Sequence, residues 1–230
     1  MALRVVCISD THGRHDDLVV PDGDVLVHAG DFTKRGTHAQ IAAFDDWLAT
    51  LPHKHKLVIA GNHELSLDAN WYPTAWKRWH REFQDPVVSK ALLRHCTYLE
   101  NETVEIDGVR FFGSPYSPVI PGAIMAFHTM SGSRAKAIWG KIPTDVDVLV
   151  THSPPHGIRD LSVRGEHCGD EDLLEEIKTR VQPKYHVFGH IHECYGSDTF
   201  EGTTYINAAS CTVQHQCTNA PIVFDIQIPK

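Results

Sequence analysis

Short apolar runs recur along the chain, and a small or polar residue follows each of them directly. The runs are four or fewer residues long and rich in β-branched side chains, which is typical of strands buried in a sheet. They are Val5–Ile8, Val25–Val27, Leu57–Ile59, Val148–Val150 and Val187–Phe188. The pattern therefore predicts a sheet built from several short strands.

Helical patterns alternate with these runs. Thr37 and Gln40 have the spacing of a capping box, and an apolar face with helical spacing follows and stops before Pro52. A second helix is expected to begin near Asp170 and to end before Pro183. The apolar faces are Ile41, Phe44, Leu48 and Leu51 in the first helix, and Leu173, Leu174, Ile177 and Val181 in the second.

Late strands are expected at Tyr205–Ile206 and Ile222–Phe224. Since strands and helices alternate and no repeat, linker or low-complexity tract interrupts them, the sequence predicts an α/β fold with a single domain spanning residues 1–230.

Two longer segments, residues 65–98 and 114–143, do not fit the alternation. Insertions of this size often shape a substrate site. In the first segment, aromatic residues recur at helical spacing, which favours core packing over a platform for stacking bases. These aromatics are Tyr72, Trp76, Trp79 and Phe83. The role of the tryptophan-rich stretch 71–79 remains open at this stage.

Composition limits which binding partners and which cellular compartment we expect for the protein. The 230 residues carry a net charge of −8 and a pI near 6.1, which gives no footprint for DNA, RNA or an anionic membrane. No apolar run is long enough to cross a bilayer, and Met1–Arg4 leads into the first strand without a signal peptide. The six cysteines form no CxxC pair, so we expect reduced thiols in a cytoplasmic protein.

Metal-ligating side chains follow the strand-like runs. Strands that end together at one edge of an α/β sheet bring such side chains into one crevice. Asp, Asn and His together suit a pair of divalent cations, so the pattern indicates a binuclear metal site at the carboxyl ends of the strands. The motifs are Asp10-Thr11-His12, Gly30-Asp31, Gly61-Asn62-His63-Glu64, Thr151-His152 and Gly189-His190-Ile191-His192.

The residue types suggest a hydrolytic chemistry. Asp10 and His12 lie two apart in a segment expected to be extended, so both can face one cation, and the two oxygens of Asp31 can bridge two cations. Two metals about 3.5–4 Å apart can share one hydroxide for in-line attack at phosphorus. His63, adjacent to a ligand, is the candidate proton donor to the leaving oxygen.

These motifs, in this order, resemble the signature of the calcineurin-like metallophosphoesterases, and more narrowly the metallophosphoesterase-domain-containing subgroup. The resemblance extends from Asp10 to Asp225, and five ordered motifs are far more specific than any one of them. The stretches that carry the subgroup resemblance are His28–Thr33, Ile59–Leu65, Thr151–Pro155, His186–Glu193, Tyr205–Ala208 and Thr218–Asp225.

The resemblance implies an α/β/β/α sandwich of two facing mixed sheets flanked by helices, with two divalent metal ions at one edge. Mn²⁺ is the expected metal, with Fe or Zn²⁺ as alternatives. His63 would contact the substrate phosphate together with Asn62, and would assist the leaving group. Carried over to this chain, the metal ligands are Asp10, His12, Asp31 and His192 for one ion, and Asp31, Asn62, His152 and His190 for the other.

The expected activity is hydrolysis of phosphodiesters, especially small or cyclic nucleotides, because the subgroup resembles class III cyclic nucleotide phosphodiesterases. Two alternatives stay open: a phosphomonoesterase or protein phosphatase, and a nucleotide-binding scaffold with little turnover. The physiological substrate, the native metal and the oligomeric state are also left open.

Several nearby residues have simpler interpretations. Glu64 is expected to support backbone geometry, His28 to be a buried histidine with its hydrogen bonds satisfied, and Cys194 to pack. His156 and His167 are either substrate contacts or solvated loop residues. The remaining histidines are expected at the surface or in the core, and they are His38, His53, His55, His80, His95, His128, His186 and His215.

Overall fold

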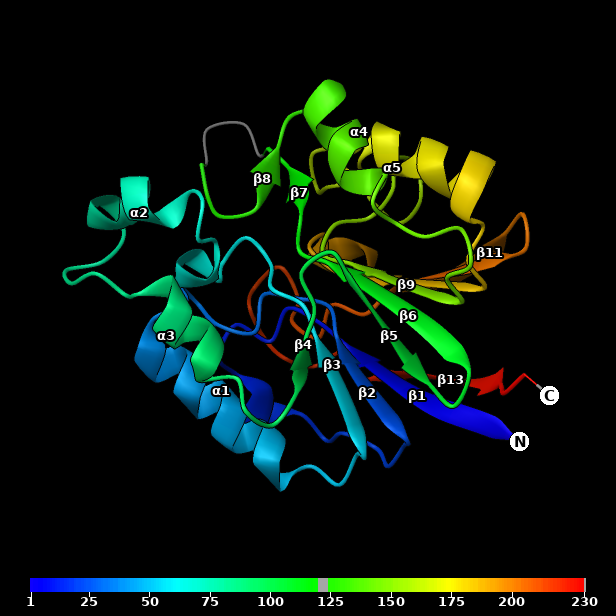
Figure 1. Ribbon diagram of the computed structural model, residues 1–230, viewed down its shortest axis with the longest axis horizontal. Helices are drawn as coiled ribbons and strands as arrows, with labels where there is room; N and C mark the ends of the chain where they lie inside the picture. Colours follow the sequence, from blue (N-terminus) through cyan, green and yellow to red (C-terminus); the bar gives the residue numbers. More distant parts are fainter. Residues whose placement is uncertain (120–123, 230) are drawn as a thin grey trace.

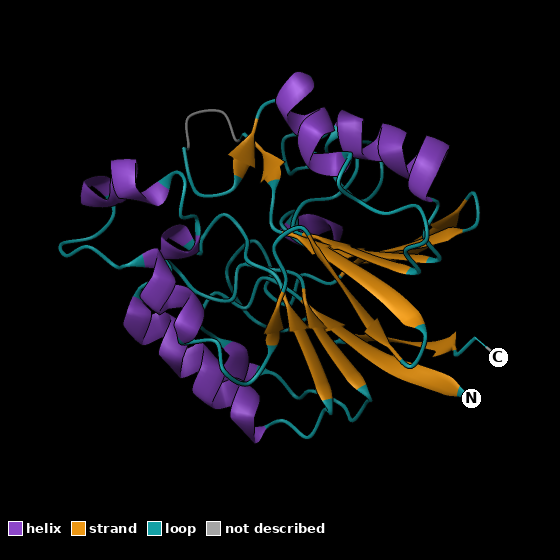
Figure 2. Cartoon of the chain, viewed as in Figure 1, coloured by secondary structure: helices purple, strands orange, loops and turns teal. Residues whose placement is uncertain are grey.

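Two β-sheets face each other at the centre of the protein, and helices cover their outer faces (Figures 1 and 2). The computed structural model describes residues 1–119 and 124–229. The mixed sheets and their helical layers give the α/β/β/α arrangement that the sequence predicts.

Both sheets are mixed, with parallel strands at the centre and antiparallel strands at an edge. The order of the first is β13 (Ile222–Gln227), β1 (Ala2–Ile8), β2 (Val25–His28), β3 (His55–Val58) and β4 (Thr97–Tyr98). The order of the second is β11 (Gly196–Phe200), β12 (Thr203–Asn207), β10 (Tyr185–Phe188), β9 (Val148–Thr151), β6 (Val109–Ser114) and β5 (Glu102–Ile106). A small pair consists of β7 (Ser117–Pro118) and β8 (His128–Thr129).

The helices divide between the two outer faces (Figure 1). The first sheet is covered by α1 (His38–Thr50), α2 (Tyr72–Ala75) and α3 (Pro86–Ala91), and the second by α4 (Ser133–Trp139) and α5 (Glu171–Glu176). A π-helical turn, η4 (Ile177–Val181), continues α5. Short 3₁₀ turns are η1 (His15–Asp17), η2 (Leu65–Leu67), η3 (Trp76–Arg78) and η5 (His192–Cys194).

The alternation of side chains along each central strand creates three apolar layers. In β1, Val5 and Cys7 point into the layer between the two sheets, whereas Val6 and Ile8 point toward the helices on the outer face. This follows from the two-residue repeat of a strand, and it requires apolar residues on both faces. The uninterrupted apolar runs of the sequence therefore reflect strands that are buried on both sides.

The two helices predicted in detail form close to their expected bounds. Asp170 caps α5 by accepting a hydrogen bond from the Leu173 amide, at 2.9 Å. Thr37 caps α1 by accepting from the Gln40 amide. The reciprocal half of the predicted capping box is wrong, because the Gln40 side chain accepts from the Arg35 amide instead of the Thr37 amide.

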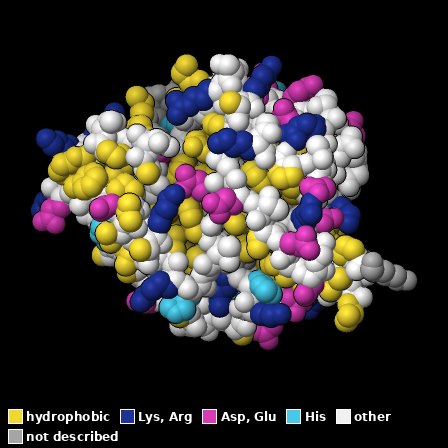
Figure 3. Space-filling model, viewed as in Figure 1, with side chains coloured by type: hydrophobic (Ala, Val, Ile, Leu, Met, Phe, Trp, Pro, Cys, Tyr) yellow, Lys and Arg dark blue, Asp and Glu magenta, His cyan; other side chains and the backbone are white. Residues whose placement is uncertain are grey.

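The aromatic stripe of residues 72–83 does not lie on one continuous helix, because the segment breaks into α2 and η3. Tyr72 is fully buried, Trp76 and Trp79 are half-buried against the same core, and Phe83 is exposed. Core packing is therefore confirmed for most of the stripe. Figure 3 shows hydrophobic side chains gathered over the region of α2, with acidic and basic side chains interspersed elsewhere on this face.

Candidate metal centre

The carboxyl ends of the parallel strands bring the predicted ligands together. Asp10, Asp31 and Asn62 follow β1, β2 and β3 of the first sheet, while His152 and His190 follow β9 and β10 of the second. Because the two sheets face each other, these ends converge between them. The buried members of the predicted set are Asp10, His12, Asp31, Asn62 and His152, and the half-buried ones are His190 and His192.

Four of these residues have a left-handed backbone. The φ angles are 53° at Asp10, 46° at His12, 55° at Asp31 and 68° at His190. Non-glycine residues adopt this region at a cost, and such positions concentrate at functional sites. The expectation that Asp10 and His12 lie in an extended segment is therefore wrong, because the chain turns sharply as it leaves β1.

The glycines of the motifs leave room for the polar side chains. A methyl group on Gly189 would overlap the carboxylate of Asp10, and one on Gly61 would overlap that of Asp31. A methyl group on Gly30 would press against the His152 ring. The glycines are thus part of the site. Because they lack a side chain, the backbone at each glycine can lie close to a candidate ligand that follows a different strand.

The first cluster lies around His12. Its Nε2 atom is 3.2 Å from Nε2 of His192 and 3.9 Å from Oδ2 of Asp31. His192 Nε2 lies 3.4 Å from Oδ1 of Asp10, and its Nδ1 donates to the Thr212 carbonyl. That last bond leaves Nε2 of a neutral His192 as the free donor atom for a cation.

The second cluster lies around His152. Its Nε2 atom is 3.0 Å from Oδ1 of Asn62, 3.2 Å from Nδ1 of His190 and 3.4 Å from Oδ2 of Asp31. Nδ1 of His152 donates to the Ala29 carbonyl at 2.9 Å, which again directs Nε2 toward the cluster.

Asp31 joins the two clusters. Its Oδ1 accepts from the His63 amide at 2.8 Å, and its Oδ2 faces His12 on one side and His152 on the other. Nitrogen and carboxylate oxygen atoms of His12, Asp31 and His63 lie within 4.8 Å of one another, as do those of Asp31, His152 and His190. Such convergence of borderline and hard ligands fits two divalent cations that share one carboxylate.

The pKa shifts of the clustered side chains show that positive charge stabilises the buried carboxylates. Burial alone would raise the pKa of Asp10, but the hydrogen bond and charge of His192 outweigh burial and lower it. Burial lowers the pKa of His152, but the Asp31 carboxylate outweighs burial and raises it to about 9. Burial likewise lowers the pKa of His192, and Asp10 raises it to about 9. Without metal, protons on these two rings balance the charge of the buried carboxylates. In a metal site, the bound cations would balance that charge instead.

His63 lies at the edge of the clusters, with 30% of its side chain exposed. Nδ1 donates to the Lys34 carbonyl at 2.8 Å, and Nε2 lies 3.9 Å from Oδ2 of Asp31. This hydrogen bond fixes the ring so that Nε2 faces both the clusters and solvent. The ring is thus placed to exchange a proton with a group bound at the clusters.

Glu64 ties the loops of the site together, as the sequence predicts for a supporting residue. Its buried carboxyl accepts from the amides of Asp31, Thr33 and Gly61, and from the Thr33 hydroxyl, at 2.7–2.8 Å. Burial and the charge of Asp31 raise the pKa of Glu64, and these hydrogen bonds oppose the rise. The loops after β2 and β3 are therefore held through one side chain.

The other singled-out residues behave more simply. His28 is fully buried and bonds through Nε2 to Thr11, but no described residue bonds to its Nδ1, so the prediction that it is satisfied is only half right. His167 bonds to Asp160 at 2.6 Å, and its ring centroid lies 5.2 Å from that of His156. Cys194 donates to the Leu161 carbonyl.

His215 is the residue that the sequence reasoning missed. Its ring centroid lies 5.2 Å from that of His12 and 5.6 Å from that of His192, and a nitrogen of each ring falls within one possible ligand group. The residue belongs to a loop whose ends pair at Cys211 and Cys217. No strand leads directly into it, so the strand-end pattern gave no signal there.

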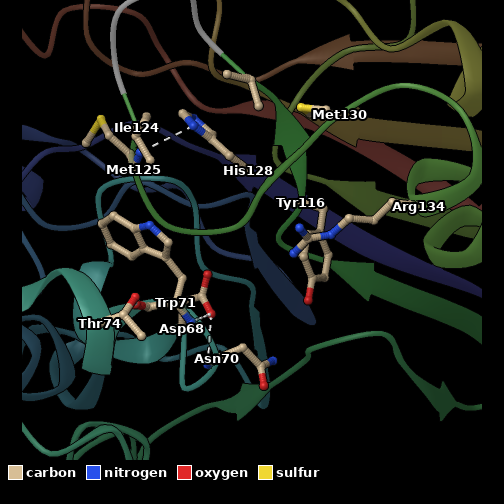
Figure 4. A pocket seen from close by; sticks show the side chains of 11 residues that line it. Asp68, Asn70, Trp71, Thr74, Tyr116, Ile124, Met125, His128, Met130 and Arg134 are labelled. Atoms are coloured by element: carbon tan, nitrogen blue, oxygen red, sulfur yellow. Dashed lines mark hydrogen bonds between the residues drawn. The ribbon is translucent and has the colours of Figure 1, made fainter.

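A cavity of about 460 Å³ is lined by residues that Figure 4 shows, among them Met125, which contacts Asn62 of the second cluster. Asn62 connects the two, because its Nδ2 contacts the Met125 sulfur at 3.3 Å while its Oδ1 faces His152. Trp71 and Tyr116 contribute aromatic surface, and Asp68 braces the wall by accepting from the Trp71 amide. The lining also includes Asn70, Thr74, Val119, Ile124, His128, Met130 and Arg134.

Comparisons with known proteins agree with this fold. The family model described as calcineurin-like phosphoesterase matches residues 3–194. Metallophosphoesterase domain-containing protein 1 of Homo sapiens is 42% identical, with 99% of this chain and 72% of that protein covered. A UPF0046 protein of Caenorhabditis elegans is also 42% identical, with 99% and 76% covered. One solved crystal structure shares the fold, with a TM-score of 0.63, 13% identity and 100% of both chains covered.

The family match, together with the clustered candidate metal ligands, supports a metal-dependent phosphoester hydrolase. The chain belongs to the calcineurin-like phosphoesterase family, as the motifs predict. No helix in the described part of the chain has the length and apolar character needed to cross a membrane.

Proposed function

We propose that the protein is a binuclear metal-dependent phosphodiesterase of small substrates, with nucleotides and cyclic nucleotides as the favoured class, and that residues 1–230 act as one domain. The observation that carries the proposal is the position of Asp31, whose Oδ2 lies 3.9 Å from His12 and 3.4 Å from His152. One carboxylate oxygen between two imidazole clusters is an arrangement that suits a two-metal centre.

The residues that would hold the metals divide around this carboxylate. When bound, two divalent cations supply a nucleophile at neutral pH and neutralise charge on the phosphoryl group. Mn²⁺ is the favoured ion, and Fe or Zn²⁺ also suits these ligands. One set is Asp10, His12, Asp31 and His192, and the other is Asp31, Asn62, His152 and His190.

The protein's own groups complete the reaction. His63 is the proposed proton donor to the leaving oxygen, because its Nδ1 is fixed by the Lys34 carbonyl and its Nε2 faces the clusters. Asn62 and His63 are proposed to orient the phosphate. The contact of Asn62 with Met125 keeps the amide oxygen, rather than its nitrogen, toward His152.

The cavity beside Asn62 supports a substrate with an organic group larger than methyl. The volume of about 460 Å³ is in the range of small-molecule sites, and the lining combines aromatic and aliphatic side chains with polar and charged ones. The flat faces of Trp71 and Tyr116 suit a nucleobase or another aromatic group.

The test is a comparison of substrates on metal-stripped protein before and after addition of Mn²⁺. Bis(p-nitrophenyl) phosphate and 3′,5′-cyclic AMP represent diesters, while p-nitrophenyl phosphate and a phosphopeptide represent monoesters. Metal-dependent turnover that is faster on the diesters is expected. Faster hydrolysis of the monoesters would instead identify a phosphomonoesterase or protein phosphatase. Tight nucleotide binding by calorimetry without hydrolysis would identify a binding scaffold.

A further inference from the structure

A second pocket, of about 350 Å³, lies on the other side of the metal centre, next to His12 and His63. It differs from the aromatic cavity in its charge. Its remaining lining residues are Arg14, Lys34, Arg35 and His215. We call these four residues and the space between them the cationic pocket.

Two of the three cations in the cationic pocket have no carboxylate partner. Lys34 and Arg35 are exposed, and neither forms an ion pair with a residue in the described ranges 1–119 and 124–229. They follow Asp31 closely in sequence, and the Lys34 carbonyl holds His63, so their backbone is fixed relative to the metal centre. The Arg35 guanidinium lies 5.9 Å from the centre of the Trp79 ring, but no carboxylate in the described ranges balances its charge or that of Lys34, and both line a pocket next to the metal centre.

The other wall of the cationic pocket is held by Arg14. Its guanidinium is 2.9 Å from Asp17 and donates to the His215 carbonyl, also at 2.9 Å. Arg14 therefore fixes the loop that carries His215, whose backbone is left-handed with φ at 55°. Through this contact, Arg14 holds the His215 ring beside His12 and His192, where it also lines the cationic pocket.

The scissile phosphate does not account for these charges. A phosphodiester carries one negative charge, and two divalent cations facing Asp10 and Asp31 already exceed it. Lys34 and Arg35 are not among the candidate metal ligands. His63, which lines the same pocket, already faces the position proposed for the scissile phosphate. A second anionic group, bonded to the same substrate, gives these cations a partner.

We propose that the cationic pocket binds a second anionic group of the substrate, a phosphate or carboxylate separated from the scissile phosphate by a sugar or a linker of similar length. The inference rests on the proposed phosphodiesterase function and adds that, among its substrates, small nucleotides with a second anionic group are preferred to those that carry the scissile phosphate alone. Lys34 and Arg35 contact this group, and His215 lines the same pocket beside the first cluster.

Two matched substrates test the proposal: the p-nitrophenyl ester of thymidine 3′-phosphate, with and without a 5′-phosphate. The Mn²⁺-loaded protein should show a kcat/KM about tenfold higher for the 5′-phosphorylated ester. The double variant Lys34→Ala/Arg35→Ala should lose this preference and keep its rate on the ester that lacks the 5′-phosphate. Lys54→Ala/Lys136→Ala, which removes two exposed lysines elsewhere, controls for net charge and should keep the preference.

Three results would overturn the inference: equal kcat/KM of the wild-type protein for both esters, equal losses of the double variant on both, or the same loss of preference in the control. Binding separates this inference from the proposed function. Calorimetry of thymidine 3′,5′-bisphosphate and thymidine 3′-phosphate with Mn²⁺-treated protein requires no turnover. If neither ester is hydrolysed, the phosphodiesterase proposal fails. The cationic pocket then stands only if the bisphosphate binds more tightly and the double variant abolishes that difference.

Discussion

The metal-ligand clusters and the pockets beside them are built in different ways. Asp31 and His152 are fully or almost fully buried at strand ends, and their partners are backbone groups and other ligands. Trp71, Lys34 and His215 come from loops or short helical turns, and their side chains are partly or largely exposed. In the proposed mechanism, the strand ends of the sheets hold the reacting groups, whereas the loops line the pockets that are proposed to select the substrate.

Asp31→Asn should have the largest effect, because it removes the one charged oxygen that both clusters share while keeping an acceptor for the His63 amide. We expect the variant to lose bound metal and turnover together. Metal content by mass spectrometry and hydrolysis of bis(p-nitrophenyl) phosphate measure this. Asp107→Asn, at an exposed turn far from the site in sequence, is the matched control. Full turnover by metal-loaded Asp31→Asn would contradict the assignment.

His63→Ala should separate metal binding from catalysis. The ring is fixed through its Nδ1 and belongs to neither proposed ligand set, so metal content should be retained while kcat falls by about 10²- to 10⁴-fold. Steady-state kinetics with saturating Mn²⁺ measures the change. His55→Ala, at the opposite end of β3, provides the comparison. If kcat is unchanged and only metal affinity falls, His63 is a ligand and not the proton donor.

Glu64→Gln should weaken the metal centre without removing any ligand. All four groups that face the Glu64 carboxyl are donors, so the amide nitrogen of glutamine would meet a donor and leave it unpaired. Outer partners of this kind typically change metal affinity by about 10- to 100-fold. Titration with Mn²⁺, read by restored turnover, gives the affinity. An unchanged affinity would mean that the loops after β2 and β3 hold their shape without Glu64.

Trp71→Ala should have the smallest and most selective effect. Loss of aromatic surface from the cavity is expected to raise KM about tenfold for a nucleoside ester and to leave methyl p-nitrophenyl phosphate unchanged. Phe83→Ala, an exposed aromatic outside the cavity lining, serves as the control. Equal losses on both esters would show that Trp71 supports the fold and does not contact the substrate.

The same contrast explains what the sequence predicted. Asp31, Asn62 and His152 were predictable because each lies within a few residues of the end of an apolar run, and the carboxyl ends of parallel strands meet. The buried strands were predictable because strands buried on both faces must be apolar throughout, whereas the two facing sheets were implied only by the family resemblance. The left-handed backbone at Asp10 was not, because it depends on hydrogen bonds to the neighbouring strand, such as that from the Asp10 amide to the Gly30 carbonyl.

The sequence indicated the aromatic cavity only at the level of segments, because its lining lies within the insertions 65–98 and 114–143, and it gave no signal for the cationic pocket. His215 lies more than 20 residues after His192, and it reaches the first cluster only because Arg14 and the paired ends at Cys211 and Cys217 fold its loop back. These are contacts between distant segments, which periodicity along the chain does not report. Trp71 similarly joins the cavity through the bracing of its amide by Asp68, not through a helical stripe.

The most direct test of the account is the number and coupling of bound Mn²⁺ ions, measured together by metal analysis and electron paramagnetic resonance on the reconstituted protein. A carboxylate shared by two clusters predicts two ions per chain with the multiline spectrum of an exchange-coupled pair, and loss of that spectrum in Asp31→Asn. A single bound ion, or two ions with independent spectra, would contradict a binuclear centre bridged by Asp31.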